Sequence, residues 1–137
     1  MRIMAIDYGD ARTGIAVSDE SATLTGDVWV IHSKKLSDVT HAIAQAVKER
    51  GVSCIVVGYP KNMDGTIGPR AEKSERLVRT LRSLIENTEI KLWDERLTTL
   101  SANRVLSDVG KFGKKRKNTV DAVAASLILE SYIGSLK

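Results

Sequence analysis

The chain has 137 residues, of which 42% are apolar and 28% charged, and this suffices for one globular domain over residues 1–137. No apolar run approaches the ~20 residues that a membrane-spanning helix needs, so we expect a cytoplasmic protein with no membrane partner. The single cysteine excludes an internal disulfide bond and a cysteine-based metal cluster. The net charge of +4 favours a polyanionic partner.

The first part of the chain predicts three short β-strands in quick succession. β-Branched and other apolar residues are concentrated at 2–7, 14–18 and 26–33, with short links between them. Strands joined in this way are typical of an antiparallel meander. The pattern then takes the period of a helix, for which Ser37 or Asp38 is the expected N-cap and Gly51 the stop.

The middle of the chain predicts strands that alternate with helices. Residues 52–57 form a continuous apolar run, as in a strand buried on both faces. A loop follows, and Pro69 then suits the first turn of a helix that we expect to reach Asn87. A short strand is expected at 89–93.

The last part of the chain predicts two further helices. Apolar residues recur at helical spacing over 102–109, and the final helix is expected from about 119 to 131. The predicted order is therefore β-β-β-α-β-α-β-α-α. A meander that continues into βαβ units predicts an α/β fold with a mixed five-stranded sheet and helices on both faces.

Acidic residues occur where the predicted strands end. Asp7 ends the first strand, Asp94 and Glu95 end the last, and Asp121 lies in the first turns of the final helix. If the first and last strands are parallel neighbours, their acids project at one end of the sheet, where sites form in open α/β sheets. Clustered carboxylates repel one another unless a cation binds, and oxygen ligands favour Mg²⁺ or Mn²⁺ over zinc.

Each acid also has a purely structural explanation. Asp7 can organise the turn that follows it through its side chain. Asp121 can be a helix-start carboxylate that the helix dipole favours. Asp94 and Glu95 can belong to a solvated charged turn. These explanations weaken together, because all of the acids are expected at one end of one sheet.

Two stretches of the chain are strongly basic. The first consists of Lys111, Lys114, Lys115, Arg116 and Lys117, and the second of Arg70, Lys73, Arg76, Arg79 and Arg82. The first stretch lies close to Asp121 in sequence, so we expect a loop there that contacts phosphate groups. The second drifts around its helix, so part of it must be ordinary solvated surface, and Glu72 and Glu75 dilute its charge.

Four short motifs follow one another along the chain. They are Asp7-Tyr8-Gly9 with Arg12-Thr13-Gly14, Val56-Val57-Gly58-Tyr59-Pro60 with Asp64-Gly65, Asp94-Glu95-Arg96-Leu97-Thr98-Thr99, and Asp121-Ala122-Val123-Ala124-Ala125. Together they resemble the YqgF (RuvX-like) family of RNase H-fold proteins, relatives of the RuvC Holliday junction resolvases. The resemblance covers nearly the whole chain. Asp10 and Tyr59 depart from the family's usual residues, and the role of Asp10 stays open between metal binding and solvated surface.

The resemblance implies an RNase H-like fold and a nuclease that matures the 5′ end of precursor 16S ribosomal RNA. Asp7, Asp121 and one of Asp94 and Glu95, with Glu95 preferred, would be the acids that bind Mg²⁺ or Mn²⁺. Two such ions about 4 Å apart would generate the attacking hydroxide and stabilise the departing oxyanion. The residues implied to hold the substrate backbone are Arg12, Arg96, Lys114, Lys115, Arg116 and Lys117.

Three alternatives remain open at the level of the sequence. The first is Holliday junction cleavage on branched DNA, which calls for two sites related by two-fold symmetry, although the sequence leaves the oligomeric state open. The second is a ribosome-assembly factor that binds nucleic acid and pre-ribosomal particles without cleavage. The third is an actin-like ATPase, whose first phosphate motif is similar to Asp7-Tyr8-Gly9, but such proteins need two domains of this size.

Overall fold

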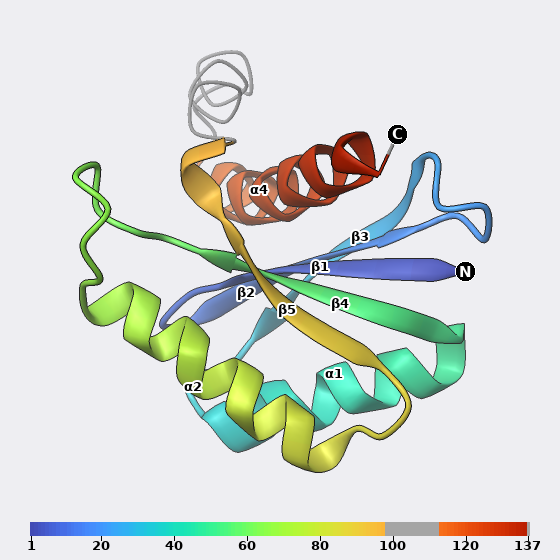
Figure 1. Cartoon of the computed structure of the whole chain (residues 1–137). Coiled ribbons are helices and arrows are strands. Elements are labelled where there is room, and N and C mark those ends of the chain that lie inside the picture. Colours follow the sequence, from blue (N-terminus) through green and yellow to red (C-terminus); the bar gives the residue numbers. More distant parts are fainter. Residues whose placement is uncertain (98–112, 137) are drawn as a thin grey trace.

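Five strands form one mixed sheet in the order β3-β2-β1-β4-β5 (Figure 1). The structure, a computed structural model, describes residues 1–97 and 113–136, with side chains at 1–96 and 120–136. The strands are β1 (Arg2–Tyr8), β2 (Arg12–Ser18), β3 (Thr25–His32), β4 (Val52–Tyr59) and β5 (Glu89–Asp94). The first three are antiparallel neighbours, β4 runs parallel to β1, and β5 runs parallel to β4. The predicted meander and mixed sheet are confirmed.

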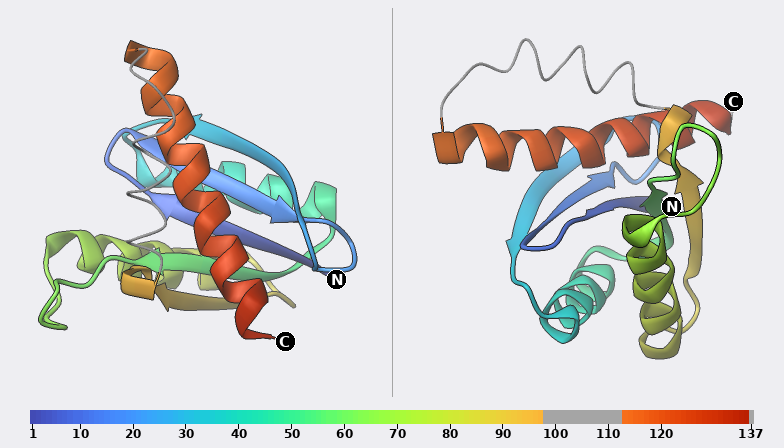
Figure 2. Two further views of the ribbon diagram at one scale, coloured as in Figure 1. Left: turned by 90° about the horizontal axis from the view of Figure 1, so that it is seen from above. Right: turned by 90° about the vertical axis from the view of Figure 1, so that its left-hand side faces the viewer.

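Helices cover both faces of the sheet, as the sequence predicts (Figure 2). The helices α1 (Leu36–Arg50) and α2 (Pro69–Leu84) pack on one face, and α4 (Gly113–Ser135) crosses the other. A short 3-10 turn, η1 (Glu95–Leu97), follows β5 directly. Within the described ranges, no helix is both long and apolar enough to cross a membrane.

The sheet separates two apolar layers, because successive strand residues point to opposite faces. On β1, Met4 and Ile6 belong to the layer under α1 and α2, whereas Ile3 and Ala5 belong to the layer under α4. The buried residues of α4 recur at helical spacing and are Ala125, Ile128, Leu129, Tyr132 and Ile133. The alternation on β1 therefore directs Asp7 to the α4 face, and the next residue, Tyr8, to the face of α1 and α2.

Two helix ends differ from the predicted ones. The N-cap residue of α1 is Lys35 rather than Ser37 or Asp38, and the Asp38 carboxylate instead accepts a hydrogen bond from the Ser33 hydroxyl. The stop at Gly51 is confirmed, with a left-handed φ of 65°. The helix α2 begins at Pro69 as predicted but ends at Leu84, since the chain turns through Asn87 in a left-handed conformation before β5.

The final helix begins earlier than the sequence predicts. It starts at Gly113 rather than about residue 119, so the backbone of 114–117 is helical, and the prediction of a loop there is wrong. Lysine and arginine are good helix formers, and no proline interrupts the stretch. Asp121 consequently lies more than two turns inside α4, which also rules out its explanation as a helix-start carboxylate. The side chains of Lys114, Lys115, Arg116 and Lys117, and the helix predicted over 102–109, lie outside the described residues.

Two glycines let other parts of the chain approach the sheet closely. A β-carbon on Gly14 of β2 would lie 2.1 Å from the backbone oxygen of Asp121 on α4. A β-carbon on Gly58 of β4 would lie 2.7 Å from Cδ1 of Ile128 and 2.9 Å from Cδ of Glu95. Any side chain at either position would push α4 or Glu95 away from the sheet.

We expect Gly14→Ala to lower the free energy of unfolding by about 1–3 kcal/mol, because the new methyl group displaces α4. Urea denaturation followed by circular dichroism measures this change. Gly134→Ala is a matched control, since Gly134 also lies in α4 but a β-carbon there meets no atom within 4 Å. The control is expected to be neutral or slightly stabilising. Equal stability of Gly14→Ala and the parent protein would show that α4 does not pack as described.

Candidate active site

The predicted acids come from three elements that meet at one end of the sheet. Asp7 lies near the end of β1, Glu95 begins η1 directly after β5, and Asp121 lies on α4. Gly14, which lies beneath the Asp121 backbone, is the register partner of Asp7 on β2. The strands β1 and β5 are parallel but are not neighbours, because β4 lies between them. Glu95 must therefore reach across β4 to meet Asp7.

Asp7 and Glu95 are joined by a hydrogen bond across β4. The bare backbone at Gly58 of β4 leaves the room for this contact. Burial, followed by the negative charge of Asp7, raises the pKa of Glu95 to about 7. Burial also raises the pKa of Asp7, although the positive charge of Arg70 opposes that shift. Below about pH 7 the Glu95 carboxyl thus keeps its proton and donates a hydrogen bond to Asp7.

Asp94, the neighbour of Glu95, is engaged elsewhere. Its Oδ2 accepts hydrogen bonds from Nε and Nη2 of Arg96 at 2.9 and 2.7 Å, and its Oδ1 accepts one from the Arg96 backbone N–H at 3.0 Å. These bonds from Arg96 lower the pKa of Asp94. Asp94 and Glu95, which the sequence left as alternatives, therefore have different partners: Glu95 contacts Asp7, and Asp94 contacts Arg96.

Asp121 is paired with Arg12 of β2. The Arg12 Nε donates a hydrogen bond to Oδ2 of Asp121 at 2.7 Å. The side chains of Arg12 and Asp121 are 37% and 19% exposed, so the pair lies at the rim of the site. No three His, Cys, Asp or Glu side chains of the described residues are grouped closely enough to hold a metal ion. Asp121 is therefore engaged by Arg12 through Oδ2 and is not grouped with Asp7 and Glu95 as a metal-binding cluster.

Arg70, one of the basic residues of α2, was not among the predicted site residues, but it acts on two of the acids. It lies in the first turn of α2, and its charge lowers the pKa of both Asp7 and Glu95. A signal was present in the sequence, because a helix that begins at Pro69 after β4 starts near the carboxyl ends of the parallel strands. Asp10, whose role was open, is 78% exposed and forms an ion pair with Lys73, away from the three acids.

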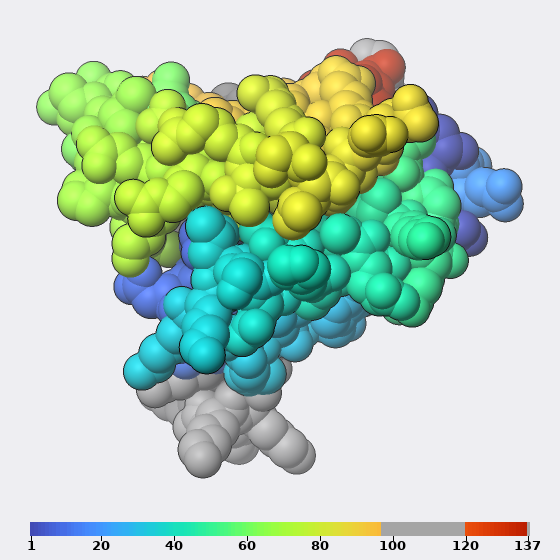
Figure 3. Space-filling view, turned by 90° about the horizontal axis from the view of Figure 1, so that it is seen from below, coloured from blue at the N-terminus to red at the C-terminus, as the bar shows by residue number. Residues whose placement is uncertain are grey.

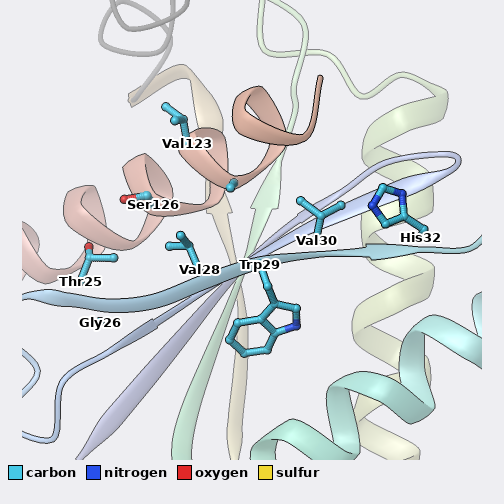
Figure 4. Close-up of a pocket in the computed structure, with 9 residues that line it drawn as sticks. Thr25, Gly26, Val28, Trp29, Val30, His32, Val123 and Ser126 are labelled. Atoms are coloured by element: carbon cyan, nitrogen blue, oxygen red, sulfur yellow. The ribbon is translucent and has the colours of Figure 1, made fainter. Parts of the chain in front are cut away.

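A groove of about 620 Å³ lies beyond Asp121, between α4 and the edge strand β3 (Figure 4). Val28 and Val30 project from β3 toward α4, whereas Trp29 points to the opposite face of the sheet. Val123 and Ser126 of α4 contribute to the other wall. This mainly apolar groove therefore borders the part of α4 that directly follows Asp121.

Comparisons with known proteins bear on the family and the fold of the chain. The family model described as "RuvX: Holliday junction resolvase" matches residues 1–135. A relative from Acetivibrio thermocellus is 42% identical over 144 aligned residues, which cover 98% of this chain and 96% of the relative. A relative from Halothermothrix orenii is 44% identical over 133 residues, covering 97% and 94%. Both carry the name "Putative pre-16S rRNA nuclease".

A solved structure, Thermus thermophilus RuvC in complex with a Holliday junction substrate, superposes with a TM-score of 0.66. The match covers 100% of this chain and 97% of RuvC at 12% identity, and so it bears on the fold alone. The mixed sheet with helices on both faces is therefore the RNase H-like fold, and acids converge at one end of it. Within that class, the full-length match and the 42–44% identical relatives show that the chain belongs to the RuvX family.

We expect the metal-free protein to lose stability as the pH rises from about 4.5 to about 7. The folded protein holds the Glu95 proton up to a pKa of about 7, whereas the unfolded chain releases it near the ordinary value of 4.5. Glu95→Gln keeps a hydrogen-bond donor without a charge. This variant should exceed the parent by about 1–3 kcal/mol at pH 8, and the difference should vanish near pH 4.

Urea denaturation in EDTA across this pH range measures the difference. Glu86→Gln is the matched control, because Glu86 is an exposed residue at the opposite end of the sheet, and the same substitution there should change little at any pH. Parallel stability profiles for Glu95→Gln and the parent would contradict the buried pair of carboxyl groups.

Proposed function

We propose that this chain is a metal-dependent nuclease that hydrolyses a phosphodiester bond near the 5′ end of precursor 16S ribosomal RNA. The observation that carries the proposal is the hydrogen-bonded Asp7–Glu95 pair, with Asp121 nearby, in a chain that the RuvX family model matches over residues 1–135. The name of the relatives supports the choice of ribosomal RNA. We further propose that residues 1–137 act as one domain, in the cytoplasm and on pre-ribosomal particles, without a membrane partner.

Asp7, Glu95 and Asp121 form the donor set that we propose for the metal. All three offer only oxygen ligands, and two of them are carboxyls whose raised pKa values reflect burial and mutual repulsion. A divalent cation relieves that repulsion, and oxygen ligands suit Mg²⁺ or Mn²⁺. Ions held by these three carboxylates would supply a hydroxide nucleophile and would stabilise the departing oxyanion.

The arginines of the site are proposed to hold the substrate backbone. Arg12 is partly exposed and already donates to a carboxylate, so a phosphate oxygen can take the place of Asp121. This exchange would free Asp121 for the metal at the moment when substrate arrives. Arg96, held by Asp94, offers a second cation after β5. Four further cations proposed for the same task are Lys114, Lys115, Arg116 and Lys117.

We expect Asp7→Asn and Glu95→Gln each to reduce cleavage more than about 100-fold, because loss of even a residue behind the metal ligands costs ~10–100-fold. The assay uses purified protein, Mn²⁺ and an RNA hairpin with a single-stranded 5′ extension. Asp94→Asn is the matched control and should retain activity within about tenfold, since Asp94 binds Arg96 and not Asp7. Unchanged cleavage by Asp7→Asn would refute the proposed nuclease site.

Cleavage of branched DNA is a second candidate, favoured by the description of the family model. The same variants can be assayed on a four-way DNA junction. A junction resolvase should act as a dimer with two sites, so sedimentation of the active species separates the two candidates. Cleavage of the hairpin by a monomer supports the ribosomal RNA substrate, whereas cleavage of the junction alone by a dimer supports branched DNA.

A binding factor without catalytic activity is distinguished by titration with Mn²⁺. Calorimetry of the parent and of Asp121→Asn compares the ligand set directly. Metal binding by the parent that is weakened in the variant supports the nuclease, and absence of binding in both supports a non-cleaving assembly factor. An actin-like ATPase is not proposed, because the family match and the relatives lead to nucleases.

A further inference from the structure

A second cluster of charged side chains lies at the same end of the sheet as the acids, on the opposite face. A hollow of about 190 Å³ is lined there by Tyr8, Asp10, Lys34, Leu36, Lys73 and Arg76, and these residues are called the strand-end patch. They come from the turn between β1 and β2, from the start of α1 and from α2. In Figure 3 this turn (blue) reaches the surface between α2 (yellow-green) and the start of α1 (cyan).

The patch is positively charged, with three cations and one acid. Glu72 and Glu75, the two glutamates among the basic residues of α2, act on Tyr59 of β4 and do not line the patch. Glu75 accepts a hydrogen bond from the Tyr59 hydroxyl, and the charges of Glu75 and Glu72 add to the burial that raises the pKa of Tyr59. The helix α2 thus directs its glutamates toward β4, and Lys73 and Arg76 toward the end of β1.

Within the patch, Lys73 is held by Asp10. The two side chains form an ion pair and are 50% and 78% exposed, so the pair contributes little to stability and can exchange partners easily. The Tyr8 hydroxyl belongs to the same hollow and can donate a hydrogen bond to an anion. Three cations and a neutral donor line one hollow, which suits a phosphate group.

The position of the patch connects it with the acids. Tyr8 follows Asp7 on β1, and their side chains point to opposite faces at the same strand end. Arg70, whose charge acts on Asp7 and Glu95, lies in the first turn of α2, the helix that also carries Lys73 and Arg76. A polyanion that crosses the end of β1 would contact both faces.

We propose that the strand-end patch binds a backbone phosphate of the nucleic-acid substrate that flanks the scissile phosphate. Lys34, Lys73, Arg76 and the Tyr8 hydroxyl are the donors, and Asp10 is an internal anion that the phosphate displaces from Lys73. The identity of the ligand as substrate rests on the proposed function. RNA and DNA both contain the phosphodiester group that the patch recognises, so we expect the patch to bind either polymer.

Fluorescence anisotropy in EDTA tests the patch without cleavage. The probes are a fluorescein-labelled RNA hairpin with a single-stranded 5′ extension and a DNA hairpin of the same sequence, each titrated at several KCl concentrations. The double variant Lys73→Gln/Arg76→Gln should bind both probes about tenfold or more weakly, with a salt slope smaller by ~0.7–0.9 for each phosphate that the variant no longer neutralises. Circular dichroism verifies that the variant is folded.

Asp10→Asn provides a test in the opposite direction, because removal of the competing anion should strengthen binding severalfold. Lys48→Gln is the matched control: Lys48 is an exposed lysine in the last turn of α1, at the other end of the sheet, and the same loss of charge there should change affinity less than twofold. A gain for Asp10→Asn in a variant that circular dichroism shows to be folded supports the site independently of the double variant.

Three results would overturn the proposal: unchanged affinity of the double variant, no gain for Asp10→Asn, or no binding of either probe by the parent protein. The test of the patch and the test of the proposed nuclease site can fail independently of each other. If Asp7→Asn abolishes cleavage while the patch variants bind as the parent does, the nuclease stands and the patch is refuted. If the patch variants behave as expected and Asp7→Asn cleaves normally, the phosphate site stands and the proposed nuclease site is refuted.

Discussion

The candidate site depends on two positions where the sheet carries no side chain. Gly14 lets the α4 backbone settle onto β2 at Asp121, and Gly58 lets Glu95 cross β4 to reach Asp7. With larger residues at these positions the acids would stand apart, each solvated and ordinary. Burial of Glu95, and then the negative charge of Asp7 beside it, raises the pKa of Glu95 to about 7, so a cation placed here would be stabilising. The same close packing at Gly14 and Gly58 that stabilises the fold therefore also holds acids together at an electrostatic cost.

The cations around this group are arranged on both faces of the same strand ends. Arg12 neutralises Asp121 on the α4 face, Arg70 acts on Asp7 and Glu95, and Lys73 and Arg76 lie on the face of α1 and α2. In the absence of substrate, two of these cations are held by acids of the chain itself, Arg12 by Asp121 and Lys73 by Asp10. A phosphodiester backbone can replace both acids, which gives substrate binding and preparation of the proposed metal site a common physical cause.

The fold was predictable from the sequence because it depends on periodicity, which is local. The meander, the buried strand β4 and the helix start at Pro69 are read from residues close in the chain. What could not be read depends on long-range geometry. The pairing of Arg12 with Asp121 joins residues 109 positions apart, and the contact of Asp7 with Glu95, which the family resemblance preferred over Asp94, needs a glycine in another strand. The early start of α4 was missed because a cluster of positive charges suggested an exposed loop, whereas lysine and arginine favour a helix.

Asp7 and Glu95, which meet across Gly58, are proposed to cleave precursor 16S ribosomal RNA. The most direct test of this function maps the 5′ ends of 16S ribosomal RNA in cells. Cells depleted of the protein would be supplied with the parent, with Asp94→Asn or with Glu95→Gln, and the 5′ ends mapped by primer extension. We expect 5′-extended precursor to accumulate after depletion, and to be corrected by the parent and by Asp94→Asn but not by Glu95→Gln. Mature 5′ ends in cells that contain only Glu95→Gln would contradict the claim.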